Sequence, residues 1–499
     1  MTKRGRPNSE FLFSTEEECL TAVPDNPSQI GSAIERFLSI SRTLAPSMRG
    51  PSGYFNGYGR VYVDSGHIEL AAMECDDPYQ LPIVVERQHR LAAQAVARMA
   101  GEGLHFVLAN NNHDFLLRDN CAVWGAHENY LVEKHPHEFS ELILPFLVTR
   151  IYAGSGGIRF PSGEFVAAVR PLCMEAATGG GTTRQRAIHS TARDENHVGS
   201  LKGRYRYHQI LGCGHRSHLN LALQFGATAL ALKAAIFDAQ LPAELKRLGL
   251  LPVAESEWIQ LLRRFNRLAA PGVPLAIDPL VVQTQRVYLE SARRVISSLR
   301  DAPLWIPRLV RDWREMIDAM DRLDRTWLAA RLDTFTKYEL FTKVLRASGT
   351  NWETLPANNR LFYSLALLDQ SYHEFCSPQS LFCRLEESGL LIHRVGDVTE
   401  PGTELESYVP ETTTRAQARA RFIRDHAYEM GLVMNWSCVH DVANERWRKL
   451  FDPFADSYGP WQKCNSPLER ALLARRIHSD ELYFAALSAE ADTVLDEIG

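Results

Sequence analysis

Residues 60–75 have the sequence Arg60-Val-Tyr-Val-Asp-Ser-Gly-His-Ile-Glu-Leu-Ala-Ala-Met-Glu-Cys75. This β-branched run with a Ser-Gly break predicts two short strands joined by a turn. Tyr62 and Asp64 then share one face of the first strand, and Val61 and Val63 take the face toward a core. A strand that ends in a carboxylate and returns with more carboxylates can form a metal site or an acid/base site. A surface strand pair with solvated acids is the alternative interpretation.

Side-chain alternation limits which acids can meet in one place. Glu69 and Glu74 are an odd number of residues apart, so a regular strand points them to opposite faces. Only one of them shares a face with Asp64 unless a bulge intervenes. We expect that residue to be Glu69, because it lies nearer the turn.

Size, charge and cysteine content describe an ordinary globular chain. The 499 residues are 45% hydrophobic and 23% charged, enough for a large core and for two or more domains. The net charge of −5 gives no general attraction to nucleic acid, and the basic start Thr2–Arg6 is interpreted as a solvated terminus. No apolar run follows it, so a secretory signal is not expected. Nine cysteines without CxxC spacing are typical of a reducing compartment, and we expect a cytoplasmic protein.

The most apolar long segment is Leu219–Leu241, which contains Asn220, Gln224, Lys233 and Asp238. These polar residues favour a buried helix of a globular protein over a membrane span. A membrane is therefore not among the expected partners.

The chain changes character along its length. Its first half mixes short strand-like runs with loops, whereas apolar residues recur at helical spacing in 281–299 and 306–332. Residues 396–414 are rich in Pro, Gly, Thr and acids, and we interpret them as a linker. We therefore expect an α+β protein with a large domain of residues 1–408, helical in its second half, and a small C-terminal domain of residues 409–499.

Histidines, carboxylates and arginines are dense and non-periodic in four further clusters. These are Gly125–Tyr130, Thr182–Arg184, Ser190–His197 and Arg204–His208. Carboxylates and imidazoles are ligands that Mg²⁺ or Mn²⁺ accepts, and arginines are natural partners of phosphate oxygens. Each residue taken singly could equally be a satisfied structural residue or part of a surface ion pair. Four clusters in one half of the chain indicate a site.

A longer ordered series of motifs then resembles one known family. The series comprises Tyr62-Val-Asp64 with Glu69 and Glu74-Cys75, Asn111, Asn112 and Asp114, His127–Tyr130, Pro145–Arg150, Gly154–Gly156, Arg193–Glu195 with His197, Arg206 and His208, Gln285-Arg286, Leu368-Asp369, Tyr372-His373, Thr412–Arg415 and Asp452–Phe454. It runs through nearly the whole chain. It resembles the Pup ligase and depupylase family, carboxylate–amine ligases related to glutamine synthetase.

The resemblance implies a fold, a reaction and a set of residue roles. The large domain would be glutamine-synthetase-like, with a curved, mostly antiparallel sheet packed by helices. With ATP and Mg²⁺, such a ligase phosphorylates the C-terminal glutamate of the small protein Pup, and a lysine of a substrate protein then attacks the acyl phosphate. Asp64 would be the catalytic aspartate. The implied metal ligands are Glu10, Tyr62, Glu69, His127 and His197, and the implied nucleotide contacts are Asn112, Arg193, Arg206, His208 and Trp436.

Two segments depart from the family pattern. The family's first strand carries two metal-binding glutamates one residue apart, and the best match for it is Asn8-Ser-Glu-Phe11, where only Glu10 is acidic. Gly212–His215 replaces a segment that is usually acidic and bears an Asn. These departures bear on metal number and on the reaction itself.

The sequence leaves four functions open. The first is a ligase joining Pup, a Pup-like modifier or another carboxylate donor to a protein lysine or other amine. The second is a depupylase or deamidase that hydrolyses the same kind of bond. The short Asp64–His67 spacing resembles the depupylases, whereas Asp452–Phe454 and the small room between Glu10 and Asp64 favour the ligase. The third is an amide ligase for small molecules or peptides, and the fourth is a non-enzymatic binder.

Overall fold

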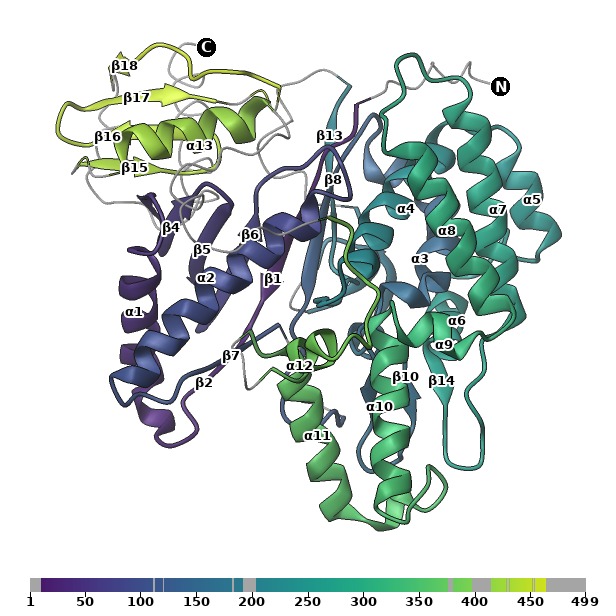
Figure 1. Ribbon diagram of the computed structural model, residues 1–499. Helices are drawn as coiled ribbons and strands as arrows, with labels where there is room; N and C mark the ends of the chain where they lie inside the picture. Colours follow the sequence, from purple (N-terminus) through teal and green to yellow (C-terminus); the bar gives the residue numbers. More distant parts are fainter. Residues whose placement is uncertain are drawn as a thin grey trace.

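A computed structural model of the chain gives the architecture in Figure 1. It describes residues 10–110, 113–119, 121–181, 184–191, 203–375, 380–396, 414–427, 429, 431–450, 452 and 454–463. Helices and a large, mostly antiparallel sheet confirm the expected α+β class.

The main sheet has eleven strands in the order β13-β8-β1-β6-β5-β4-β3-β15-β16-β17-β18. All neighbours are antiparallel except β15 and β3, which are parallel. The strands are β1 Phe13–Glu18, β3 Ser47–Gly50, β4 Gly53–Asn56, β5 Gly59–Asp64, β6 His67–Ala72, β8 Ala126–Val132, β13 Tyr205–Gln209, β15 Leu432–Met434, β16 Cys438–Asp441, β17 Arg446–Lys449 and β18 Gln462–Lys463. Smaller sheets pair β2 Leu20–Ala22 with β7 Val107–Ala109, β11 Ala176–Gly179 with β12 Ala187–Ser190, and β10 Phe165–Val166 with β9 Gly157–Ile158 and β14 Arg267–Ala269.

The predicted strand pair of residues 60–75 is the β5–β6 hairpin. Ser65 and Gly66 form its two-residue turn with φ angles of 47° and 87°, the positive values that a tight turn between twisted strands requires. Val61 is buried on the core side with Ile68 and Leu70 of β6. The expectation for this segment is therefore confirmed.

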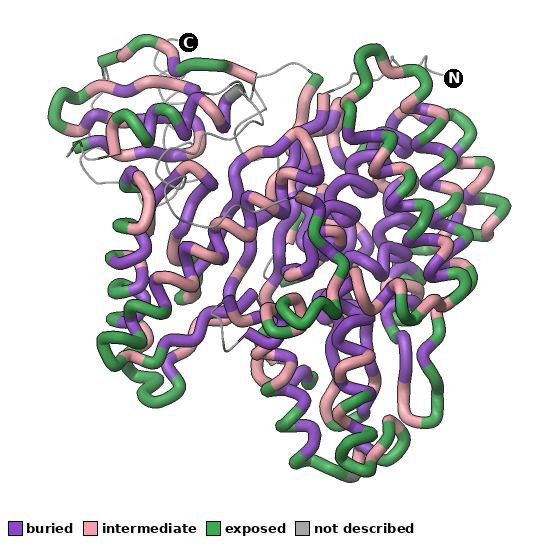
Figure 2. Tube along the Cα trace, in the orientation of Figure 1, coloured by how far each residue is buried: buried purple, intermediate pink, exposed green. Residues whose placement is uncertain are grey.

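Two helices cover that core side of the β5–β6 region. Helix α1 (Ile30–Ser41) contributes Phe37, and α2 (Leu81–Gly101) contributes Ala95 and Met99 to one apolar cluster with Val61 and Leu70. Pro82 lies in the first turn of α2, where its missing N–H costs no helical hydrogen bond. Burial along these elements is visible in Figure 2.

The second half of the chain is helical, as expected. Its helices are α3 Ser140–Thr149, α4 His218–Phe237, α5 Leu241–Arg247, α6 Glu255–Asn266, α7 Pro279–Ile296, α8 Ile306–Asp321, α9 Arg325–Ala329, α10 Asp333–Ala347, α11 Asn359–His373 and α12 Leu381–Glu387. By length and composition α4 could cross a membrane, but its most apolar window is wholly buried inside the structure. It is the expected core helix, and its Phe225 packs against Phe13 of β1 and Tyr130 of β8.

The apolar stripe of 306–332 does not form one continuous helix. Helix α8 ends at Asp321, and Leu323 adopts a left-handed conformation with φ 49°. The Asp324 side chain then accepts a hydrogen bond from the Trp327 N–H and caps α9. Helical spacing continues through the break, so periodicity alone did not reveal it.

The C-terminal unit consists of α13 (Thr414–His426) and β15–β18, and it lies beside β4 at the upper end of the sheet (Figure 1). Pairing of β15 with β3 continues the main sheet into this unit. Glu74, which follows β6, forms ion pairs with Arg415 and Arg419 of α13. The predicted boundary at residue 408 falls within 397–413, outside the described residues, and stays a prediction.

Candidate active site

Strand register brings the polar side chains of five neighbouring strands to one face of the sheet. Cα partners across a ladder point to the same side, and the pairs Tyr62–Glu69, Asp64–His67, Glu18–Glu69, Glu16–His127 and His208–Asn129 are in register. Helices α1, α2 and α4 pack on the opposite face. The face that carries these polar residues is the candidate site.

Strand β1 carries two carboxylates of this face. Phe13, Thr15 and Glu17 are buried on the core side, whereas Glu16 and Glu18 alternate onto the site face and are partly buried. Glutamates one residue apart are the pattern that the family places on its first strand. The sequence analysis placed this pattern at Asn8-Ser-Glu, of which the structure describes only Glu10, so that placement stays a prediction.

Glu10, the expected metal ligand, lies elsewhere. It forms an ion pair with Arg204, whose Nε donates to Glu10 Oε2 over 2.9 Å, and the Arg204 guanidinium lies 5.1 Å from the centre of the Phe454 ring. Among the described residues, neither group of possible metal ligands contains it. Glu16 and Glu18 instead show the one-residue spacing on the face of the candidate site. The signal that could have identified them is the alternation of apolar and acidic residues from Phe13 to Glu18.

The first group of possible metal ligands consists of Glu18, His67 and Glu69, whose ligand atoms lie within 4.8 Å of one another. The Tyr62 hydroxyl donates a hydrogen bond to Glu69, so Tyr62 borders this group as expected. Burial raises the pKa of Glu69. Although burial opposes ionisation of Glu18, His127 and Arg170 lower the pKa of that carboxyl.

The second group consists of Glu16, His127 and His208, again with ligand atoms within 4.8 Å. His127 lies between the two groups, because its Nδ1 is 3.9 Å from Glu16 and its Nε2 is 3.6 Å from Glu18. Burial opposes ionisation of Glu16, but the neighbouring His127, Arg206 and His208 hold its pKa well below the usual range. The expected metal ligands Tyr62, Glu69 and His127 are thus brought together. His208, which was expected to contact the nucleotide, belongs to this second group of possible metal ligands.

The donor chemistry of both groups fits a divalent cation. Each combines ionisable carboxylates with imidazoles, a set that Mg²⁺ or Mn²⁺ accepts. The His208 Nδ1 lies 3.0 Å from Asn129 Oδ1. The same Nδ1 lies 3.1 Å from Arg206 NH2, which can only donate, so Asn129 and Arg206 together orient the His208 ring.

Arginines border the face at its β8–β13 end. Arg206 Nε donates to Asn129 Oδ1 over 2.8 Å, and its NH2 lies 3.2 Å from Glu16 Oε1. Arg170 is buried behind His127, where its NH2 donates to His127 Nε2 over 3.4 Å. Arg206 therefore lies at the edge of the site with Asn129 and Glu16 as partners, whereas Arg170 orients an imidazole.

Asp64 is exposed at the end of β5, directly across the ladder from His67. It shares the face with Glu69, as alternation predicted, and Glu74 points away toward Arg415 and Arg419. Asp64 lies at a strand end, beside the two groups of possible metal ligands. A substrate can therefore reach its carboxylate without rearrangement of the sheet.

Trp436 lies between β15 and β16, where the C-terminal unit meets β4. Its ring is packed edge-on against Phe55 at 5.1 Å between centroids, and the Arg419 guanidinium lies 4.8 Å from the ring centre. Contact with a nucleotide base remains a prediction for this residue. Asn112, Arg193 and His197 lie outside the described residues, so their predicted roles also remain predictions.

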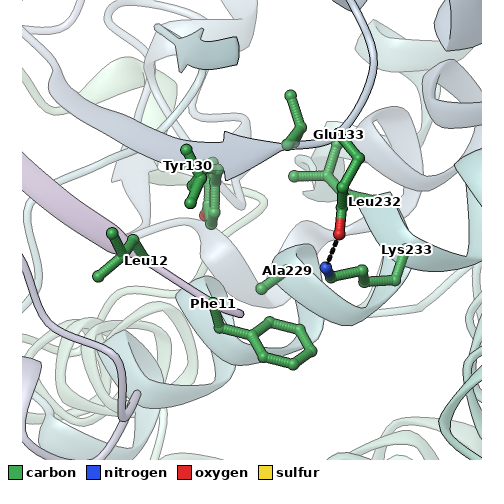
Figure 3. Close-up of a pocket in the computed structure, with 9 residues that line it drawn as sticks. Phe11, Leu12, Tyr130, Glu133, Ala229, Leu232 and Lys233 are labelled. Carbon is green, nitrogen blue, oxygen red and sulfur yellow. Dashed lines mark hydrogen bonds and ion pairs between the residues drawn. The ribbon is translucent and has the colours of Figure 1, made fainter. Parts of the chain in front are cut away.

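A small cavity lies on the other side of β8 and is not this site. It is lined by Phe11, Leu12, Tyr130, Leu131, Val132, Glu133, Ala229, Leu232 and Lys233. Figure 3 shows the Lys233–Glu133 ion pair at one end of an otherwise apolar lining. None of the expected site residues lines it.

Two carboxylate–imidazole groups beside an arginine could hold a divalent cation, an arrangement that phosphoryl-transfer enzymes use. Known proteins agree with this class. The sequence profile of the Pup-ligase proteins matches residues 32–440. Similar proteins include the Pup--protein ligase of Brachybacterium faecium, 31% identical over 83% of this chain and 87% of that protein. That of Acidimicrobium ferrooxidans is 30% identical over 82% of this chain and 88% of that protein. The chain therefore belongs to the Pup ligase family.

Solved structures share the fold. The ligase PafA in complex with the prokaryotic ubiquitin-like protein Pup superposes with a TM-score of 0.69 and 23% identity, covering 98% of this chain and 95% of that one. The Pup ligase PafA in complex with ADP gives a TM-score of 0.61 and 21% identity, over 90% of this chain and 94% of that one. The resemblance inferred from the motifs is confirmed.

Proposed function

We propose that this protein is an ATP-dependent ligase that joins the C-terminal glutamate of Pup, or of a Pup-like modifier, to a lysine of a substrate protein. Family membership, relatives that are Pup--protein ligases and a PafA structure with ADP support this function. The observation that carries it is the gathering of Asp64 and both carboxylate–imidazole groups on one face of the sheet.

The reaction begins with activation of a carboxylate. A carboxylate does not react with an amine in water, so its oxygen first takes the γ-phosphoryl group of ATP, which gives an acyl phosphate and ADP. Glu18, His67 and Glu69, and Glu16, His127 and His208, are the groups that would hold Mg²⁺. Bound Mg²⁺ supplies positive charge against the phosphate oxygens. Arg206 adds a guanidinium at the same edge, where it can bind a phosphate oxygen.

The second step joins nitrogen to the activated carbon and releases phosphate. The lysine ammonium must lose a proton, and free aspartate and lysine differ by about six pKa units, roughly 8–9 kcal/mol. Asp64 therefore takes the proton as the new bond forms rather than from a resting ammonium. Its exposed place at the end of β5 lets a protein lysine reach it.

A depupylase or deamidase is the second candidate, and the short Asp64–His67 turn favours it. The same face would then direct water to the bond carbon. The ligases among the relatives outweigh this feature. A small-molecule or peptide donor is supported only if conjugation to protein fails, so one experiment separates these outcomes.

The experiment combines the protein with ATP, Mg²⁺, a Pup ending in glutamate and a lysine-bearing acceptor protein. Intact-mass spectrometry measures conjugate and an enzyme-coupled assay measures ADP. A ligase forms one ADP for each conjugate, and Asp64→Asn lowers the turnover of both about 100-fold or more. Asp25→Asn, which neutralises a carboxylate on a side chain that is 78% exposed and belongs to neither group of possible metal ligands, is the matched control and keeps both. Hydrolysis of a purified conjugate without its formation would identify a depupylase instead.

The seven cysteines that the structure describes are all free thiols. Free thiols are typical of a reducing compartment. This supports the cytoplasmic location that we infer for the protein.

A further inference from the structure

Strand β1 carries a third glutamate between the two that face the site. Glu17 is only 2% exposed and points to the core side, opposite Glu16 and Glu18. A carboxylate buried in this way is costly unless donors satisfy it. The proposed reaction gives it no role.

Two donors from different elements hold the Glu17 carboxylate. His89 of α2 donates through Nε2 to Glu17 Oε2, and its ring stacks on Phe375 at 4.1 Å between centroids. Asn110, directly after β7, donates through Nδ2 to Glu17 Oε1 over 3.2 Å and to the carbonyl oxygen of His215 over 3.0 Å. Both carboxylate oxygens are therefore fixed.

The orientation of Asn110 is set by a buried chain of hydrogen bonds from the helical half. Lys337 of α10 donates to Asp369, to the Gly156 carbonyl oxygen over 3.0 Å and to His373 Nε2 over 3.1 Å. Because His373 Nε2 accepts, its Nδ1 carries the proton and donates to Asn110 Oδ1 over 2.9 Å. The amide of Asn110 can then only turn its NH2 toward Glu17.

Burial and the nearby Lys337 lower the pKa of His373 well below its usual value. The imidazole is therefore neutral, which agrees with one ring nitrogen accepting and the other donating. Each hydrogen bond along the chain from Lys337 to Glu17 is therefore donated toward Glu17. Helices α10 and α11, the end of β7 and α2 converge on the middle of β1.

We propose that Glu17 is a positioning residue, which anchors β1 from behind so that Glu16 and Glu18 keep the separation and direction needed to hold the divalent cation. This inference rests on the proposed metal-dependent function. Glu17 is the direct chain neighbour of both Glu16 and Glu18, so one peptide unit separates it from each of them. Any rotation or sliding of β1 that Glu17 resists would move both of those carboxylates.

The test measures binding of Mn²⁺ itself, by the loss of its free-ion paramagnetic resonance signal on titration with the full-length protein. Glu17→Gln is the sharpest variant, because it keeps the shape and removes the anionic acceptor. Its amide oxygen can still face Asn110, and its amide nitrogen can face His89 if that ring changes tautomer. We expect Mn²⁺ affinity to fall about tenfold, within the range for partners that orient metal ligands. The half-saturating Mn²⁺ concentration for ADP formation rises in parallel, while the rate at saturating Mn²⁺ recovers toward that of the unchanged protein.

Asp238→Asn is the matched control. Asp238 is also a buried carboxylate held by a hydroxyl and an arginine, Ser291 and Arg294, but it lies at the end of α4, away from β1. The Asp238→Asn substitution is expected to lower the free energy of unfolding without changing Mn²⁺ affinity. If Glu17→Gln behaves in the same way, Glu17 is merely structural and the inference is overturned.

Two further outcomes remain decisive. If the unchanged protein does not bind Mn²⁺, the proposed metal site itself fails, which is distinct from failure of the Glu17 role. If Glu17→Gln does not fold, the pair His89→Gln and His89→Leu replaces it. Glutamine restores a donor toward Glu17 and leucine does not. Weaker Mn²⁺ binding in His89→Leu alone supports the inference, and equal binding in both variants overturns it.

Discussion

Replacing Glu74 by glutamine tests how the C-terminal unit is held against the sheet. Glu74 binds Arg415 and Arg419 of α13, and the three side chains are only 13%, 7% and 2% exposed. Arg419 also donates to the Trp436 carbonyl oxygen over 2.9 Å. One carboxylate therefore links the end of β6 to the helix and the tryptophan of the C-terminal unit.

The magnitude follows from burial. Removing one partner of a buried ion pair leaves the other charge uncompensated and costs about 3–5 kcal/mol. At 1.4 kcal/mol for each factor of ten, that is roughly 100-fold to 3,000-fold in the opening equilibrium of the C-terminal unit. Two guanidinium groups lose their anion here, so we expect a value in the upper half of this range.

Hydrogen exchange measured by mass spectrometry resolves this opening, because amides of β15–β17 exchange when the unit detaches. Exchange there should accelerate about 700-fold or more in Glu74→Gln, while amides of α4 keep their rates. Glu102→Gln is the matched control, since it removes the carboxylate of an exposed ion pair with Arg36, and it should leave both regions unchanged. If β15–β17 exchange at the unchanged rate in Glu74→Gln, the buried ion pairs do not hold the unit and the reasoning is wrong.

Three other predictions concern the site and the pH dependence. Asp64→Asn should keep the unfolding transition and the ADP affinity seen by calorimetry but lower turnover about 100-fold or more, as expected for loss of a general base; retained turnover would remove Asp64 from the reaction. Glu18→Gln should raise the Mg²⁺ concentration needed for ADP formation at least tenfold, whereas Glu10→Gln should not; the reverse result would restore Glu10 as the ligand. Although burial opposes it, Arg415 and Arg419 hold the pKa of Glu74 well below its usual range. Its contribution to stability is therefore present above the unfolded value of about 4.3 and is lost as pH falls below it. Denaturant unfolding between pH 7 and pH 3 should show a smaller acid loss in Glu74→Gln than in the unchanged protein, and parallel curves would contradict this assignment.

The sequence predicted what local alternation determines. The β5–β6 hairpin followed from a β-branched run and a Ser-Gly turn, and side-chain parity correctly separated Glu69 from Glu74. The same rule applied to residues 13–18 would have found Glu16 and Glu18. The motif comparison instead selected Glu10, which forms an ion pair with Arg204 and belongs to neither group of possible metal ligands among the described residues.

Other parts of the site depend on contacts that no local pattern contains. His67 and His127 reach Glu18 only because β1 pairs with β6 on one side and with β8 on the other. The β1–β8 pairing joins segments more than 100 residues apart, and packing of the core face fixes this strand order. The same holds for Glu17, whose partners come from α2 and from the residue after β7. Three consecutive glutamates are typical of a solvated surface, so the sequence did not indicate that Glu17 is buried.

Each residue lies where the sheet holds its side chain as precisely as its proposed role requires. Metal ligands must hold their geometry closely, and Glu16 and Glu18 lie on a strand that is paired on both edges. Asp64 must instead meet the lysines of a protein surface, which arrive in differing orientations. It lies at the last position of β5, exposed, beside a turn whose two residues have positive φ. On the proposed function, a metal site held on β1 between β8 and β6 and an accessible base at the end of β5 would let one fold activate a single carboxylate and still accept many amines.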